Sequence, residues 1–272
     1  MKNHDAANSP EFDHTAKVAT SWARGQGLAL NPSGTGFARV EDALFIPLDT
    51  DSREEFGRGA GGELNRMHSL RSSSALAFNV FAPWKPNPTP VAAVLGGTGR
   101  YDKIGFERQY PTGVSSRHPH LDVVFDGGAP PIAIESKFVE IYDDPTPAEF
   151  SPRYLESEEL WMGMPNLKAL ARKLMVNPPS FVRLGAGQLV KHTLGLAREY
   201  GHDGFRLTYL WYDFHSEAAA THRLEVERFT EVATQDIDFR AITHQDLFGA
   251  LTRLEEPAPG YLKYLAGRYG LG

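Results

Sequence analysis

Two short apolar segments on either side of a break rich in Gly and Pro constrain the fold more than any other part of the chain. Residues 120–125 and 132–138 are both rich in β-branched and aromatic side chains. Such segments flanking a turn are typical of a β-hairpin. We expect a hairpin whose loop is centred between Gly128 and Ala129.

Charged residues share one face of this predicted hairpin. With the loop centred there, Asp122 lies opposite Glu135 and His120 lies opposite Lys137. Because side chains alternate along a strand, Glu135 and Lys137 point to the same side as Asp122. Facing residues have Cβ atoms about 5 Å apart, so two carboxylates there repel each other. Buried charges are costly unless they are paired or bind a metal ion.

A divalent cation would explain this concentration of charge. Hard cations such as Mg²⁺ prefer carboxylate oxygen, and a bound cation can activate a water molecule. We therefore expect Asp122 and Glu135 to bind Mg²⁺ or Mn²⁺. Lys137 would supply a positive charge to a phosphate or to the attacking water. The alternative is a buried ion network that only stabilises the core.

The residues Asp122 and Glu135-Ser136-Lys137 resemble the active-site pattern of the PD-(D/E)xK nuclease superfamily. In that pattern an acidic residue on one strand is followed on the next strand by an acidic residue, any residue and lysine. Position 121 is Leu, where the pattern has Pro. A second resemblance covers residues 63–140. Its most specific part is the His/Ser-rich segment leading into Ala75-Leu76-Ala77-Phe78-Asn79-Val80-Phe81, which is similar to the helix ahead of the active-site hairpin in a bacterial subfamily.

This resemblance implies a restriction-endonuclease-like α/β fold, with a central mixed β-sheet flanked by helices in the order αβββαβ. It implies Mg²⁺-dependent hydrolysis of DNA that leaves a 5′-phosphate and a 3′-hydroxyl, in restriction, defence or repair. The backbone carbonyl of Ser136 would help to hold the metal. Gln188 would support the site from the helix after the hairpin, and Glu63 would be a further metal ligand. For Glu63 the alternative is an acid that stabilises a helix N-terminus.

Basic residues after the hairpin are the predicted substrate contacts. Residues 163–200 carry six Lys and Arg residues against Glu199 alone. Local basicity of this kind is what phosphate contacts require, although a solvated helix face has the same composition. Gln188, Lys191 and His192 share one face of a helix predicted over 187–198. The expected substrate-binding residues are His120, Lys191, Arg172 and Lys173.

Composition limits the other possibilities. The 272 residues carry a formal net charge of −6 and contain no cysteine. The absence of cysteine excludes disulfides, thiolate zinc sites and cysteine nucleophiles.

Acidic residues dominate 138–160, a segment that we expect to face away from nucleic acid or to form a movable element. We expect a cytoplasmic protein that binds double-stranded DNA and no membrane. Cleavage of both strands would favour a homodimer. A catalytically idle DNA-binding or assembly protein of the same fold is the competing interpretation.

The remaining sequence predicts one domain. Residues 1–35 are polar and are expected to form an N-terminal tail, followed by a single nuclease-like domain over 36–272. Charged residues followed by glycines near the start of this domain predict a loop over 49–62. Beyond that loop, the expected helices are 63–81, 216–233 and 244–254, and the expected strands outside the hairpin are 101–111, 205–213 and 239–243.

Overall fold

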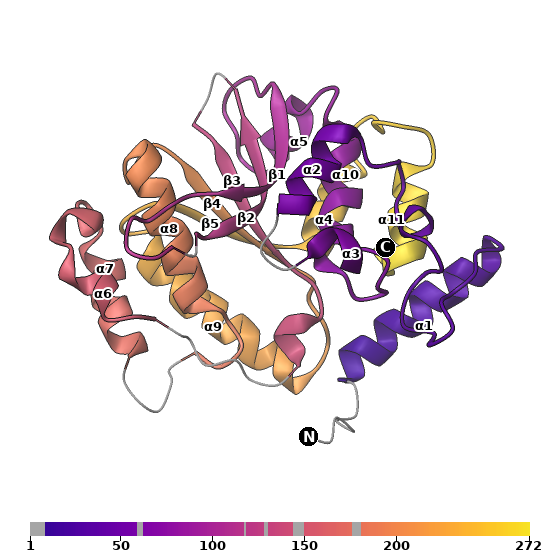
Figure 1. Ribbon diagram of the computed structural model, residues 1–272, viewed down its shortest axis with the longest axis horizontal. Coiled ribbons are helices and arrows are strands. Elements are labelled where there is room, and N and C mark those ends of the chain that lie inside the picture. Colours follow the sequence, from indigo (N-terminus) through magenta and orange to yellow (C-terminus); the bar gives the residue numbers. More distant parts are fainter. Residues whose placement is uncertain (1–8, 59–61, 117, 128–129, 144–149, 176–180) are drawn as a thin grey trace.

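The computed structural model describes residues 9–58, 62–116, 118–127, 130–143, 150–175 and 181–272. It is a mixed α/β structure in which a five-stranded sheet is flanked by helices, as expected for a restriction-endonuclease-like core (Figure 1). The strands are β1 (Lys103–Gln109), β2 (His120–Asp126), β3 (Ile132–Lys137), β4 (Arg206–Trp211) and β5 (Asp238–Thr243), and they lie side by side in that order. The pairs β1–β2 and β2–β3 are antiparallel, whereas β3–β4 and β4–β5 are parallel.

The α-helices are α1 (Pro10–Gly25), α2 (Thr50–Arg58), α3 (Glu63–Arg66), α4 (Ser73–Phe81), α5 (Thr89–Val94), α6 (Arg153–Glu156), α7 (Pro165–Leu174), α8 (Ala186–Tyr200), α9 (Glu217–Ala233), α10 (His244–Leu251) and α11 (Tyr261–Tyr269). Short 3₁₀ turns are η1 (Val40–Ala43), η2 (Ala82–Trp84), η3 (Glu140–Tyr142) and η4 (Glu158–Trp161). None of the helices in the described ranges is both long and apolar enough to cross a membrane.

The predicted hairpin is confirmed, including its register. Val123 pairs with Ile134, and Phe125 pairs with Ile132, as expected for a loop centred between Gly128 and Ala129. The two loop residues themselves lie outside the described part of the chain. Because this register fixes which side chains share a face, it places Asp122 and Glu135 on the same side of the sheet.

Helices cover both faces of the sheet (Figure 1). On one face, Phe81 of α4 packs against Phe125 of β2, with ring centroids 5.7 Å apart. On the opposite face, the hydroxyl of Tyr209 on β4 lies 2.9 Å from Nε2 of His222 on α9. Tyr209 is paired with Glu135 of β3, and Glu135 contacts His192 of α8, so the side that faces α8 and α9 is the side that carries Glu135.

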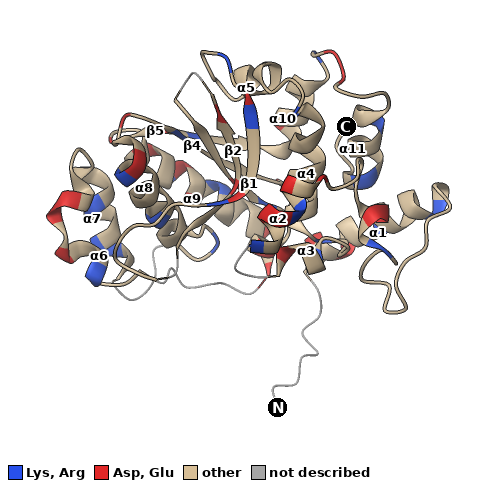
Figure 2. Cartoon of the chain, turned by 45° about the horizontal axis from the view of Figure 1, so that its top comes forward, with Lys and Arg blue, Asp and Glu red and all other residues tan. Residues whose placement is uncertain are grey.

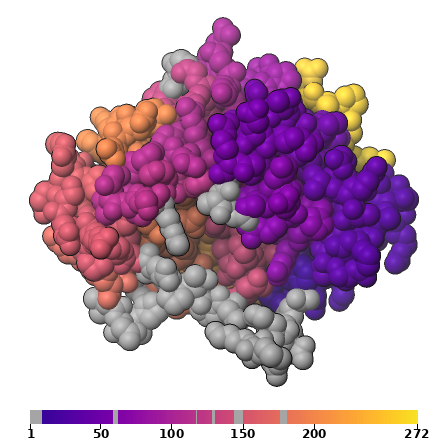
Figure 3. All heavy atoms as spheres, in the orientation of Figure 1, coloured from indigo at the N-terminus to yellow at the C-terminus, as the bar shows by residue number. Residues whose placement is uncertain are grey.

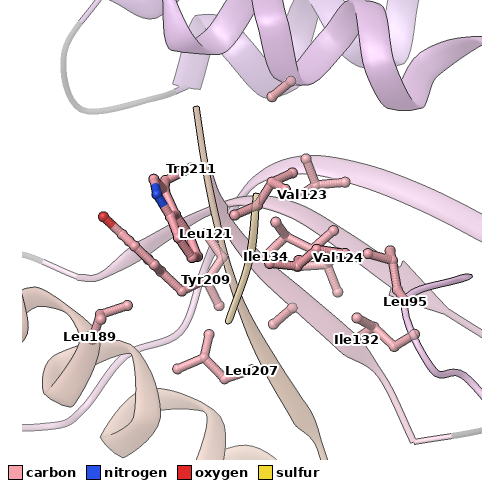
Figure 4. Close-up of a cluster of buried hydrophobic side chains, with 14 of the residues drawn as sticks. Leu95, Leu121, Val123, Val124, Ile132, Ile134, Leu189, Leu207, Tyr209 and Trp211 are labelled. Atoms are coloured by element: carbon pink, nitrogen blue, oxygen red, sulfur yellow. The ribbon is translucent and has the colours of Figure 1, made fainter. Parts of the chain in front are cut away.

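Buried apolar side chains cluster on the inner strands of the sheet and on the helix beside them (Figure 4). Val123, Ile134 and Leu207 are fully buried, as is Leu189 from α8. Full burial of an aliphatic side chain stabilises the fold by about 1.5–3 kcal/mol relative to its exposure. These contacts hold the two strands of the site in a rigid setting.

The segment before the hairpin differs from its prediction in two places. Residues 50–58 form helix α2 and not a loop, because Asp49 accepts the N–H of Ser52 at 2.7 Å and Phe56 is buried. The helix expected over 63–81 is divided into α3 and α4. Between them the N–H of Leu70 donates to the carbonyl of Thr35, and the side chain of Ser72 then caps α4.

Residues 10–25, which were expected to lie in a polar tail, form helix α1 and pack against α11 (Figure 1). The ring of Trp22 contacts that of Tyr264 edge to face, with centroids 5.1 Å apart. A Cβ on Gly267 would lie 2.6 Å from Trp22, so the glycine permits this close approach. The few apolar residues of α1 form a buried stripe that the polar composition concealed. In the space-filling view, this helix and its neighbours form one side of the molecule and α6–α7 form the other (Figure 3).

Candidate active site

A cleft of about 1030 Å³ lies where the hairpin, α3 and the N-terminal half of α8 meet. The residues predicted for the site that line it are Asp122, Glu135, Lys137, Gln188, Lys191, His120 and Glu63. Residues from four separate elements of the chain therefore line one cleft. Their chemical roles stay a prediction.

The acidic and basic residues of the hairpin are in direct contact. Nζ of Lys137 lies 2.6 Å from Oε1 of Glu135. The backbone N–H of Ser136 donates to Oδ2 of Asp122 at 2.6 Å. The side chain of Ser136 points away from these groups, because its Oγ lies 3.2 Å from Nε2 of His244 on α10. Asp122 and Glu135 are thus held on β2 and β3 by separate partners.

Burial and neighbouring charges move the pKa values of these groups in different directions. Burial alone would raise the pKa of Glu135, but Lys137 and His192 lower it to about 2. Burial would lower the pKa of Lys137, but the surrounding carboxylates, Glu135 first among them, raise it. Burial and the charges of Glu135 and Glu107 raise the pKa of Asp122. At neutral pH the Glu135–Lys137 pair is therefore ionised, and a bound cation would stabilise the charged form of Asp122.

His192 is a site residue whose role the sequence left unassigned. Its Nε2 lies 3.0 Å from Oε2 of Glu135, in an orientation that does not make a hydrogen bond, and its side chain is 1% exposed. It shares one face of α8 with Gln188 and Lys191, as the helical spacing predicted. That spacing was the available signal, because it places His192 on the same face as the two residues that were selected.

Glu107 of β1 is the second cleft residue that the sequence did not single out, because a charged strand residue is more often solvated. It stands between the pairs Phe106–Val123 and Arg108–Leu121, opposite Asp122. Its side chain is 6% exposed, and its φ of 50° is left-handed. Burial, followed by the charges of Glu63 and Glu135, raises the pKa of Glu107 to about 8.

Glu63 lies in the wall of the cleft with two partners of its own. Its Oε1 is 2.5 Å from Nη2 of Arg66, and its Oε2 accepts the hydroxyl of Ser74 at 2.9 Å. The carboxylate therefore links α3 to the first turn of α4. His120 also faces the cleft, and its Nδ1 lies 3.8 Å from Oε2 of Glu107.

The charged segments contribute unevenly to the cleft. Arg172 and Lys173 are exposed on α7 and do not line the cleft, so their contact with substrate stays a prediction. Glu140 and Asp143, from the acidic segment, do line it, so the expectation that this segment faces away is wrong for them. The residues 144–149 of the same segment lie outside the described part of the chain. In the view of Figure 2, acidic and basic residues are interspersed on both sides of the sheet.

The donor atoms of the cleft suit a hard divalent cation. Asp122, Glu135 and Glu107 supply carboxylate oxygens, and Lys137 is paired with Glu135. Oε2 of Glu135 is buried and makes no hydrogen bond. Within the described ranges, no three His, Asp or Glu side chains are already spaced as ligands of one metal ion. Oxygen-rich sites of this kind are the preference of Mg²⁺ and Mn²⁺.

Residues 37–270 match the sequence model of a family described as Restriction Endonuclease associating with ARP. The match spans most of the chain and all of the site residues named above, so the chain belongs to this restriction-endonuclease family. No curated protein and no solved structure matches the chain.

Proposed function

We propose that this family member is a nuclease that hydrolyses phosphodiester bonds of DNA with Mg²⁺ or Mn²⁺ as cofactor. The observation that carries the proposal is the convergence of Asp122, Glu135 and Lys137 in one cleft, with Lys137 Nζ 2.6 Å from Glu135 Oε1. The PD-(D/E)xK pattern supplies the same three residue types. A structural ion network would leave no reason for the open cleft beside them.

The residues that would hold the cation are Asp122, Glu135 and the backbone carbonyl of Ser136. When bound, the cation would polarise the scissile phosphate and lower the pKa of a water molecule. In the reaction, the water oxygen forms a bond to phosphorus and the bond from phosphorus to the 3′ oxygen breaks. The products carry a 5′-phosphate and a 3′-hydroxyl, whose proton comes from the water.

Lys137 acts as a permanent positive charge and not as a base. Because Glu135 and the other carboxylates raise the pKa of Lys137, its ammonium stays protonated at neutral pH. A protonated amine can donate hydrogen bonds to the attacking water and to the phosphate, but it cannot accept a proton. Its place beside Glu135 lets it orient the water and stabilise charge that develops on phosphorus.

The substrate contacts of the proposal lie along the cleft and on α8. Gln188 and Lys191 face the cleft from the first turns of α8, and His120 faces it from β2. Arg183, at the approach to α8, lines the same wall. Side chains of these types bind phosphate oxygens and fix the register of a duplex without reading its sequence. Cleavage of both strands would need a second active site, supplied by a second copy of the chain.

The competing proposal is a protein of the same fold that binds DNA or a partner without cleaving it. It differs in one respect that an assay can measure. An idle binding protein would bind DNA, but neither the wild type nor any variant of the hairpin would change the covalent state of the DNA.

The test is cleavage of supercoiled plasmid with Mg²⁺, Mn²⁺ or chelator. Asp122→Asn, Glu135→Gln and Lys137→Met should each lower the cleavage rate on the order of 10²-fold or more, because each removes a charge that acts at the reacting phosphate. The matched control is Lys263→Met, which removes an exposed lysine of α11 outside the cleft and should cleave like the wild type. Equal cleavage by all four variants would refute the proposed site.

A further inference from the structure

Glu107 has a backbone conformation that needs an explanation. Among the described residues it is the one non-glycine residue with a positive φ, at 50°. It occupies the middle of β1, between two residues that pair regularly with β2. A left-handed conformation is costly for a residue with a side chain, and such strain persists only where the surrounding structure imposes it.

The side chain of Glu107 is buried without a matching basic partner. It is 6% exposed, and its recorded ion-pair contact is Nδ1 of His120 at 3.8 Å. Glu63, by contrast, is paired with Arg66 and Ser74. Lys137, the basic residue of the hairpin, is already in contact with Glu135. The carboxyl group of Glu107 is therefore buried in the cleft without a Lys or Arg within ion-pair distance among the described residues.

An independent observation on β3 points to a missing ligand in the same cleft. Oε2 of Glu135 is buried and makes no hydrogen bond, although Nε2 of His192 lies 3.0 Å from it, and the Glu135 side chain is 2% exposed. An unsatisfied buried acceptor is costly. A divalent cation would bind this oxygen and would also stabilise the charged forms of the neighbouring carboxyl groups.

We propose that Glu107 is a third carboxylate ligand of the divalent-cation site, contributed by β1 opposite Asp122. Cation binding would draw the three carboxyl groups closer together than they lie here, where no three described side chains are spaced as ligands of one metal ion. This inference rests on the proposed function, since it assigns a residue to the same cation. The left-handed backbone would direct the side chain into the cleft. Glu63, already bound to Arg66 and Ser74, would support α3 and α4 and would not coordinate the cation.

The test is the affinity for Mn²⁺ and Mg²⁺ without DNA, measured by isothermal titration calorimetry. Glu107→Gln should weaken binding tenfold or more, a loss of the size seen when groups around a metal are removed. Glu55→Gln is the matched control, because Glu55 accepts the N–H of Phe106 on the same strand but does not line the cleft. It should bind the cation like the wild type.

A second variant separates a ligand from a structural residue. Glu107→Gly should melt no lower than the wild type, because glycine adopts a positive φ without strain. It should nevertheless lose cation affinity as Glu107→Gln does. A large fall in melting temperature together with unchanged affinity would show that Glu107 is structural and would overturn the inference.

The outcomes also distinguish this inference from the proposed function. Binding by Glu107→Gln as tight as that of the wild type would overturn the role of Glu107 alone. If Glu63→Gln lost affinity for the cation and Glu107→Gln did not, Glu63 would be the third carboxylate ligand. That result would also overturn the role of Glu107. A wild type that binds neither cation would overturn both proposals together.

Discussion

The backbone N–H of Ser136 donates a hydrogen bond to Oδ2 of Asp122 across 2.6 Å. The paired residues of β2 and β3 end at Val123 and Ile134, one position before Asp122 and Glu135. The carboxylate therefore takes over as acceptor where the regular pairing of the two strands ends. Asp122 has a structural task in the hairpin that is separate from any role toward a cation.

These two tasks predict different results for two substitutions of Asp122. Asp122→Ala leaves the N–H of Ser136 without its acceptor and should lower the free energy of unfolding by about 1–3 kcal/mol. Asp122→Asn keeps an oxygen acceptor and removes a charge whose raised pKa shows that the fold disfavours it. It should be at least as stable as the wild type. Urea unfolding at pH 7 without divalent cations measures both, and equal destabilisation would contradict this account.

The contact between Glu135 and Lys137 predicts a strong dependence of each residue on the other. Lys137→Met leaves the carboxylate of Glu135, which is 2% exposed, without its closest positive charge. Removal of one partner of a buried pair costs about 3–5 kcal/mol, whereas removal of both costs far less. The double variant Glu135→Gln, Lys137→Met should therefore be more stable than Lys137→Met alone. Additive losses in the double variant would show that the pair does not interact in the folded protein.

Two glycines in helices predict opposite effects of the same substitution. Gly267→Ala in α11 would place a Cβ 2.6 Å from Trp22, so it should lower stability by about 1–3 kcal/mol. Gly249→Ala in α10 meets nothing within 4 Å. It should raise stability by up to about 1 kcal/mol, because alanine favours the helix. Thermal unfolding of the pair measures this difference, and a stabilising Gly267→Ala would show that α1 does not pack on α11.

His222 predicts a loss of stability in acid. Burial, followed by the charges of Arg223 and Arg183, lowers the pKa of His222 to about 3, whereas an unfolded histidine has a pKa of about 6.5. Between about pH 6.5 and pH 3, His222 is therefore protonated in the unfolded chain but neutral in the folded chain. Stability from this group is complete above about pH 6.5 and is lost as the pH falls toward 3.

The comparison variant is His222→Gln, whose side chain can still face the hydroxyl of Tyr209 but does not titrate. Between pH 7 and pH 5 the wild type should lose about 2 kcal/mol more unfolding free energy than this variant. Unfolding curves at the two pH values provide the measurement. Identical losses would mean that the folded protein protonates His222 readily.

Local sequence patterns were sufficient to predict the centre of the site. They could not predict residues whose positions depend on long-range contacts. The alternation of side chains fixed the register of β2 and β3, so that Asp122, Glu135 and Lys137 could be grouped from the sequence. Glu107 was underrated, because its position depends on the register of β1 against β2 across a long connection and on a backbone angle that no pattern encodes. Helix α2 was missed since glycines at its end concealed the buried Phe56.

The packing of α1 on α11 also bears on where this protein can be truncated without loss of contacts. The family match begins at residue 37, after α1. A chain shortened to that boundary would retain every residue of the cleft that has been assigned a role, but would leave the faces of Tyr264 and Gly267 without Trp22. The packed structure therefore includes α1, whereas the segment that matches the family does not.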